Sequence, residues 1–279
     1  MSVTVRQKPL RILLAGLAVG AAVGLASAPA LAHRAWLLPS MTVLSKQGEW
    51  ITVDAARSNT LFVFEHRPMA IDGLVVKSPN GDPVEAQNVG EGELRTSFDL
   101  KLDQAGTYRI SVVDRRFSGS YMDKGERQRV RARSADELAK AIPAGAPQAQ
   151  RRKVAITSET FVTVGAPTTD VFTPAGDGLE MVPVTHPTDL YAGEEARFRF
   201  LLNGEPAAGL EVQMAQATGL FGDETGGVKL TTDDQGIVAF SWPAPGYYWM
   251  STAMRGEAAD ADGLVPSYRY NATFAVLPQ

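Results

Sequence analysis

From Ala35 to the C-terminus, short apolar runs alternate with turn-forming residues. Within the runs apolar and polar residues alternate with a period of two, and glycine, proline, asparagine and aspartate separate one run from the next. This patterning is typical of antiparallel strands packed face to face, because each strand then buries one of its two faces. The sequence therefore predicts an all-β fold of two immunoglobulin-like antiparallel β-sandwich domains with little helix.

The predicted strands fall into two sets on either side of a connector rich in glycine, proline and threonine, residues 165–178. The first set comprises residues 35–38, 50–55, 73–77, 94–101, 106–113 and 155–164. The second comprises residues 179–184, 195–202, 210–216, 227–232, 237–241, 246–254 and 268–276. Because such connectors are typical of domain boundaries, we expect a first domain over residues 33–165 and a second over 166–279.

The first 32 residues have the three parts of a secretory signal peptide. Residues 1–11 carry three basic side chains and no acidic one, residues 12–25 are apolar, and a box of small residues ends at Ala32. Cleavage after Ala28 or Ala32 fits the small-x-small rule, and Pro29 disfavours the first point. A retained membrane anchor is the alternative, but the apolar run is mostly alanine and glycine and has no charged stop-transfer patch. We expect cleavage after Ala32 and a periplasmic protein.

Composition narrows the possible functions. The chain has no cysteine, so disulfides, thiolate metal sites and cysteine nucleophiles are excluded. Loss of the leader removes three basic residues and changes the net charge from -4 to -7, which makes nucleic acid an improbable partner. No glycine-rich phosphate loop, Gly-x-Ser-x-Gly elbow or His-Glu-x-x-His motif is present, so the sequence gives no support to nucleotide or hydrolase chemistry.

Cleavage after Ala32 would make His33 the first residue of the mature chain. A free α-amine and the Nδ1 atom of an N-terminal histidine can chelate one cation, and a second histidine completes the arrangement called a histidine brace. The chain has only three histidines, His33, His66 and His186, and imidazole is a preferred ligand of copper, nickel, cobalt and zinc where thiolates are absent. A site with all three is one hypothesis. A chance N-terminal histidine and a hydrogen-bonded loop histidine are the structural alternatives for His33 and His66.

Several stretches resemble one bacterial family. They are AHRAWLLP (32–39), FEHRP (64–68), LEMVPVTHP (179–187), NGEP (203–206) and DQG (234–236). The family is formally a domain of unknown function and has been described as NikM-like, or as the periplasmic component of cobalt and nickel transport. The resemblance covers nearly the whole mature chain and implies two β-sandwich domains and a periplasmic location. It also implies that His33 and His66 are the metal-binding pair, whereas His186 stands where we expect other polar residues in relatives.

Three further residues near the candidate pair have two readings each. Glu65 and Asp54 could bind metal or orient an imidazole, although a solvated carboxylate is the commoner status of such residues. Trp36 could shield a metal at the terminus, but a tryptophan in a first strand more often lies in the core.

Residues 115–153 are strongly basic and lie outside the apolar alternation, so we interpret them as an excursion from the first sandwich. Ser134 and Glu137 have capping-box spacing and open a short helix over residues 136–142, which Pro143 ends. A solvated hairpin and helix is the favoured reading of the basic stretch. A surface for lipid headgroups or an acidic partner protein is the alternative.

Three functions compete. The first is a periplasmic protein that binds a divalent transition metal, nickel, cobalt or copper, and acts in uptake beside a membrane transporter or a TonB-dependent receptor. It would be a binding protein and not an enzyme. The second is a histidine-brace copper oxidase or oxygenase that uses the same histidines. The third is a structural or accessory module for an outer-membrane receptor, with no metal.

Overall fold

The computed structural model describes residues 33–218, 227–256 and 258–279. The expected signal peptide lies outside these residues. The described residues belong to one unit of the chain. No helix in the described part of the chain is long and apolar enough to span a membrane.

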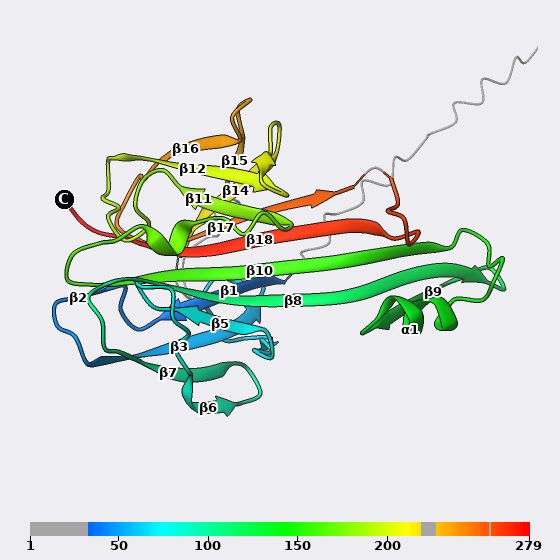
Figure 1. The fold of residues 1–279 in the computed structure, drawn as a ribbon, viewed down its shortest axis with the longest axis horizontal. Helices are drawn as coiled ribbons and strands as arrows, with labels where there is room; N and C mark the ends of the chain where they lie inside the picture. Colours follow the sequence, from blue (N-terminus) through cyan, green and yellow to red (C-terminus); the bar gives the residue numbers. More distant parts are fainter. Residues whose placement is uncertain (1–32, 219–226, 257) are drawn as a thin grey trace, which may run out of the picture. The chain divides into compact units, whose positions relative to one another are not determined.

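Most of the described residues are in strands (Figure 1). The strands are β1 (Arg34–Pro39), β2 (Val43–Leu44), β3 (Glu49–Ser58), β4 (Arg67–Pro68), β5 (Leu74–Lys77), β6 (Gln87–Glu91), β7 (Thr96–Leu102), β8 (Gly106–Asp123), β9 (Glu126–Ala132), β10 (Gln150–Val164), β11 (Leu179–Pro183), β12 (Glu195–Leu202), β13 (Glu205–Pro206), β14 (Glu211–Gln216), β15 (Val228–Thr231), β16 (Ile237–Ser241), β17 (Gly246–Arg255) and β18 (Val265–Val276). The helical elements are α1 (Ala135–Ala141) and the 3₁₀ turn η1 (Asp170–Phe172).

These strands form three sheets within the described residues. The central sheet has nine strands in the order β15-β14-β17-β18-β10-β8-β5, with β2 paired to β10 and β9 paired to β8. The first outer sheet has the order β1-β3-β7-β6, with β4 on β3. The second outer sheet has the order β11-β12-β13, with β16 on β12. The expected all-β sandwich architecture is confirmed, and strands from both halves of the chain contribute to the central sheet.

Each outer sheet packs on the central sheet through its own hydrophobic core. The first core includes Leu37, Phe98 and Val162, whereas the second includes Phe161 and Phe198. Phe161 and Val162 are consecutive residues of β10, and consecutive side chains of a strand point to opposite faces. The central sheet is therefore buried on both faces at this point, and it forms one layer of both sandwiches.

The expected boundary at residues 165 and 166 lies between β10 and β11, and the central sheet contains strands from both sides of it. β10, from the first half, pairs with β18, from the second half, between Arg152↔Val265 and Thr160↔Thr273. This pairing and the short pairing of β10 with β2 are parallel, whereas the other strand pairs of the central sheet are antiparallel. Parallel pairing of β10 with β18 was available because the whole second half of the chain lies between the two strands and serves as the crossover connection.

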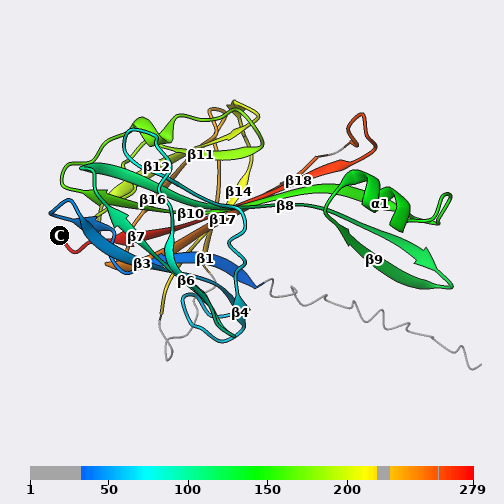
Figure 2. The same ribbon diagram turned by 60° about the horizontal axis from the view of Figure 1, so that its bottom comes forward.

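Residues 115–153 form what we call the arm, which comprises the end of β8, then β9, α1 and the start of β10. Figure 2 shows β8 and β10 continuing side by side away from the sandwiches toward α1 and β9. Their antiparallel pairing is unbroken as far as Ser120↔Gln150. The basic stretch is therefore an extension of the central sheet, and it contains the hairpin of β8 and β9 and the helix α1.

The arm packs around a small hydrophobic cluster to which Leu264, just before β18, also contributes. Ala132, Leu138, Ile142 and Leu264 are buried together there. The expectation that this stretch has no strand alternation is wrong, because arginine occupies every second position of β9, at residues 127, 129 and 131, while Val130 faces the helix side. The arginines therefore lie on one face of β9, and Val130 and Ala132 lie on the other, toward the cluster.

The predicted helix is confirmed to within one residue. The Ser134 Oγ atom accepts a hydrogen bond from the Glu137 amide at 3.1 Å, as expected for an N-cap. The Glu137 carboxylate accepts from the Arg133 amide at 2.8 Å rather than from the Ser134 amide, so the second bond of the capping box is displaced by one residue.

Candidate functional site

His33 and His66 lie against each other. Their imidazole rings are stacked, with centroids 3.6 Å apart and planes 13° from parallel. His33 immediately precedes β1 and His66 immediately precedes β4, and both strands pair with β3. β3 therefore brings together two histidines that are far apart in the sequence.

Both rings are accessible for coordination. Each side chain is exposed, and neither ring nitrogen makes a hydrogen bond within the described residues. The pKa of His66 is lowered, chiefly by partial desolvation and then by the positive charges of His33 and Arg67, against an opposite effect of Glu65. The neutral imidazole is the form that binds metal, so this shift favours coordination near neutral pH.

The two stacked rings would have to change their orientation to bind one metal together. A metal bound to imidazole lies near the ring plane, about 2.0 Å from the nitrogen, so two parallel rings cannot both hold it without tilting. Rotation about the side-chain bonds of two exposed residues supplies that tilt. The arrangement offers two imidazoles and, if cleavage follows Ala32, the α-amine of His33.

A cleft of about 360 Å³ adjoins the histidine pair. We call it the arginine cleft, because four arginines line it together with His33. Arg57 and Arg67 come from neighbouring positions on β3 and β4 of the first outer sheet. Arg116 and Arg269 come from β8 and β18 of the central sheet. The cleft therefore lies where the two layers of the first sandwich diverge.

Positive charge exceeds negative charge at this cleft. Asp114 is the carboxylate partner of two arginines: its Oδ2 atom lies 2.6 Å from Arg116 Nη1 and 3.6 Å from Arg57 Nη2. Burial, followed by the charge of Arg67, lowers the pKa of Arg57 despite the opposite effect of Asp114. The Nε atom of Arg57 is buried and has no hydrogen-bond partner among the described residues. Arg57 thus retains an unused donor.

His186 lies in a different environment. Its Nε2 atom donates to the Thr168 carbonyl oxygen at 3.1 Å and lies 3.0 Å from Thr107 Oγ1. Its Nδ1 atom accepts from the Thr188 hydroxyl at 3.1 Å. Thr163 extends this network, at 3.0 Å from Thr107 and 2.7 Å from Thr188. Both ring nitrogens are engaged, and among the described residues no group of three or more histidines and carboxylates could hold a metal.

The remaining sequence candidates have structural roles. Trp36 is 1% exposed and donates through its Nε1 atom to Ser58 Oγ at 2.9 Å, which supports the core interpretation. One Glu65 oxygen accepts from the amides of Asn59 and Thr60 and thereby shapes the loop before His66. Asp54 accepts a short hydrogen bond from Ser97 and pairs with Arg95.

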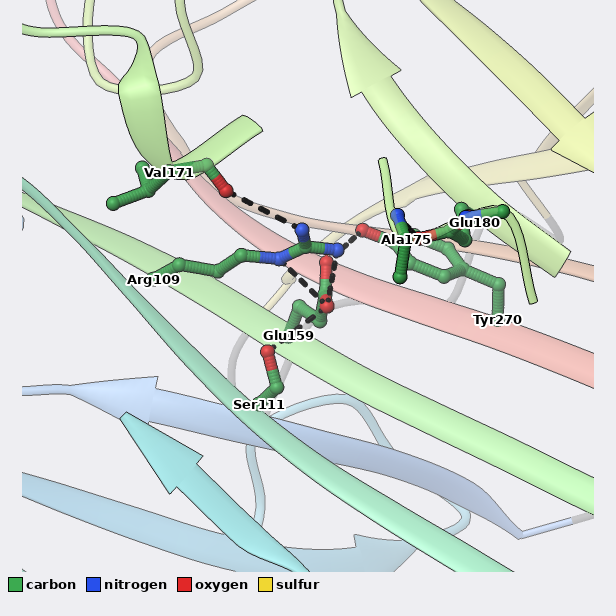
Figure 3. Close-up of polar contacts among 8 residues, drawn as sticks. Arg109, Ser111, Glu159, Val171, Ala175, Glu180 and Tyr270 are labelled. Carbon is green, nitrogen blue, oxygen red and sulfur yellow. Dashed lines mark hydrogen bonds and ion pairs between the residues drawn. The ribbon is translucent and has the colours of Figure 1, made fainter. Parts of the chain in front are cut away.

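Glu159, which the sequence analysis did not single out, is the centre of a second polar cluster (Figure 3). Its Oε1 atom lies 2.8 Å from Arg109 Nη2 and accepts from Ser111 Oγ at 2.9 Å. Its Oε2 atom accepts from the Tyr270 hydroxyl at 2.6 Å, and burial raises the pKa of Tyr270 well above its usual value. Glu159 is 2% exposed and both of its oxygens are engaged. The cluster therefore fastens β8, β10 and β18 together and leaves no free group for chemistry.

The sequence analysis did not group the four arginines of the cleft, and it included only Arg116, within the basic stretch 115–153. They come from four strands and share no spacing or motif, so the linear sequence carries no signal that groups them. The strand register places two of them side by side. Ala35 pairs with Arg57 across β1 and β3, and Arg57 pairs with Arg67 across β3 and β4.

No curated protein matches the chain. Among solved structures the chain is similar to the D0-D1 domain of intimin, with 13% identity, a TM-score of 0.22 and coverage of 86% of this chain and 97% of that one. It is also similar to the human OSCAR ligand-binding domain, with 13% identity, a TM-score of 0.20 and coverage of 88% and 100%. The fibronectin(III)-like modules of Clostridium thermocellum CbhA give 10% identity, a TM-score of 0.18 and coverage of 87% and 94%. With scores this low, none of these similarities bears on function.

The family comparison covers most of the chain. The model of a domain of unknown function, DUF4198, matches residues 30–256. This range includes all three histidines, the arm and three of the four cleft arginines, whereas Arg269 lies beyond it. The chain belongs to the DUF4198 family.

Proposed function

We propose that this protein binds one divalent transition metal through His33 and His66 and serves metal uptake or handling in the periplasm. The observation that carries the proposal is the stack of the two rings at a centroid distance of 3.6 Å. Two exposed imidazoles without hydrogen bonds in the described structure are available as ligands. If the signal peptide is removed after Ala32, the new α-amine adds a third nitrogen beside them.

The donor set favours copper and nickel over zinc. Copper and nickel stand high among divalent metals in affinity for nitrogen ligands, and an amine with two imidazoles suits their square or tetragonal geometry. Zinc in closed structural sites prefers four ligands in a tetrahedron. Cobalt stays within the proposal because the family resemblance in the sequence extends to cobalt and nickel transport. A membrane transporter or a TonB-dependent receptor is the partner that such a role implies.

Calorimetric titration of the mature protein with Cu²⁺ and with Ni²⁺ tests this function. We expect one metal per chain and a loss of about tenfold or more in affinity for His66→Ala, because removal of an outer partner alone costs about 10–100-fold in metal sites. His186→Gln is the matched control, since it also removes one histidine and should keep the affinity. Unchanged binding by His66→Ala, with both variants folded, would exclude the site.

A further inference from the structure

The arginine cleft presents an electrostatic problem for the proposed metal site. A bare dication at His33 would lie beside a cleft lined by Arg57, Arg67, Arg116 and Arg269. Asp114 is the carboxylate that pairs with two of them. Like charges in a partly desolvated site repel each other more strongly than in water. A free aqueous metal ion is therefore a poor electrostatic match for this surface.

We propose that the metal arrives as an anionic complex with a small polycarboxylate, and that the arginine cleft binds the carboxylates while the histidines complete the coordination. This inference rests on the proposed metal-binding function and names the substrate class of that site. It resolves the conflict between cation ligands and cationic surroundings, because the complex as a whole carries negative charge.

The cleft suits such a ligand in its donors. Guanidinium groups form paired hydrogen bonds with carboxylates, and arginine remains charged at any physiological pH. Arg57 and Arg67 reach the cleft from the first outer sheet, and Arg116 and Arg269 from the central sheet, so carboxylates of one ligand can be held by both sheets. Arg57 lines the cleft, and its only carboxylate partner among the described residues, Asp114, lies 3.6 Å from its Nη2 atom and is shared with Arg116.

The size of the cleft and the ligand-exchange chemistry are also consistent with a metal–polycarboxylate complex. A cleft of about 360 Å³ is at the small end of ligand sites in proteins. Coordination proceeds by ligand exchange: each imidazole nitrogen that binds the metal displaces a water or one carboxylate oxygen, and a displaced carboxylate pairs with an arginine. No electron is transferred, and the metal keeps its charge throughout.

Equilibrium dialysis with labelled nickel and labelled citrate tests the inference. The mature protein is dialysed against nickel chloride alone, citrate alone and an equimolar mixture, and both labels are counted. We expect retention of nickel and citrate in equal amounts from the mixture. Arg67→Gln and Arg269→Gln should each lower citrate retention about tenfold, as expected for loss of one charge-assisted pair, while nickel from the chloride salt is still bound. Arg131→Gln, in the arm and outside the cleft, is the matched control.

The outcomes separate this inference from the proposed function. If the protein binds nickel but never retains citrate, the metal site stands and the chelate inference is wrong. If it retains nickel from neither source, both are wrong. Equal citrate retention by the cleft variants and by Arg131→Gln would also overturn the inference, and circular dichroism of each variant establishes that it is folded.

Discussion

His186 and the pair His33 and His66 show two opposite uses of the same side chain. His186 has both ring nitrogens engaged with the threonine network that connects the sheet to the connector. His33 and His66 are exposed and contact mainly each other. A histidine whose hydrogen-bonding capacity is used internally stabilises the fold, whereas one whose nitrogens face solvent remains available to a ligand.

The two arginine clusters repeat this contrast. Arg109 faces Glu159, with two of its nitrogens 2.8 and 2.9 Å from Oε1, and the pair is completed by Ser111 and Tyr270. Arg57 shares Asp114 with Arg116 and keeps an unpartnered Nε atom. We call a side chain saturated where its polar atoms all have partners, and unsaturated where they do not. We infer that saturated side chains maintain the shared central sheet and that unsaturated ones bind the ligand. Each prediction below tests that division.

The largest effect is expected at Glu159. Glu159→Ala should lower the free energy of unfolding by about 3–5 kcal/mol, because it leaves the buried Arg109 charge and the Tyr270 hydroxyl without their partner. Urea denaturation measures the loss. Glu205→Ala, at an exposed position of β13, is the control and should change stability by no more than about 0.5 kcal/mol. A loss at Glu159 as small as that of the control would refute the role given to the cluster.

The histidines should separate into two classes. His186→Ala should cost about 1–3 kcal/mol in stability, because threonine hydroxyls of its network lose their partner, and should leave metal affinity unchanged. His66→Ala should do the reverse, with stability within about 0.5 kcal/mol of the parent and much weaker metal binding. Denaturation and metal titration of both variants check this. The division between saturated and unsaturated histidines fails if both variants lose the same property.

Much of the fold was predictable because strand formation depends on local alternation. The predicted strand at residues 195–202 coincides with β12, and the one at 237–241 with β16. The parallel pairing of β10 with β18 was not predictable, because no local feature of either strand specifies its partner. The long extension of β8 was missed because residues 114–123 are mostly polar and contain no continuous apolar alternation.

The candidate site was predictable only in part. The leader and the family resemblance pointed to His33 and His66, and the structure places these two side chains together. His186 was a candidate only because the chain has just three histidines, and that number carries no information about where a side chain lies. The arginine cleft depends on the register of strands from both halves of the chain, which a single sequence does not encode in any readable spacing.

Acid should destabilise the fold through His186. Burial lowers the pKa of His186 in the folded protein. The unfolded chain therefore binds a proton more readily, at a pKa of about 6.5, and the stabilising contribution is complete above that pH and is lost as the pH falls below it. Between about pH 7.5 and pH 5, the free energy of unfolding should fall more steeply with acid in the parent than in His186→Gln. Denaturation of both proteins across this range measures it. The same pH dependence of stability in the parent and in His186→Gln would contradict the assignment of this effect to His186.

The smallest effects are expected in the arm. Ser134→Ala should remove the N-cap bond of α1 at a cost of about 1 kcal/mol or less, without any change in metal affinity. Amides of β9 and α1 should exchange with solvent faster than those of β10 near Phe161, because the hydrophobic cluster of the arm is small and the arm lies at the end of the sheet. Exchange rates in the arm as slow as those in the sandwich cores would show that it is part of the stable body.

The central claim is that an N-terminal His33 and His66 form one metal site. The most direct measurement compares copper or nickel affinity of a protein that begins at His33 with that of a protein carrying one extra N-terminal residue. The extra residue removes the α-amine from His33 and leaves both imidazoles intact, so the affinity should fall by about tenfold or more. It should fall further on acidification below neutrality, as protons compete for the nitrogens. Equal affinities for the two forms would contradict the account.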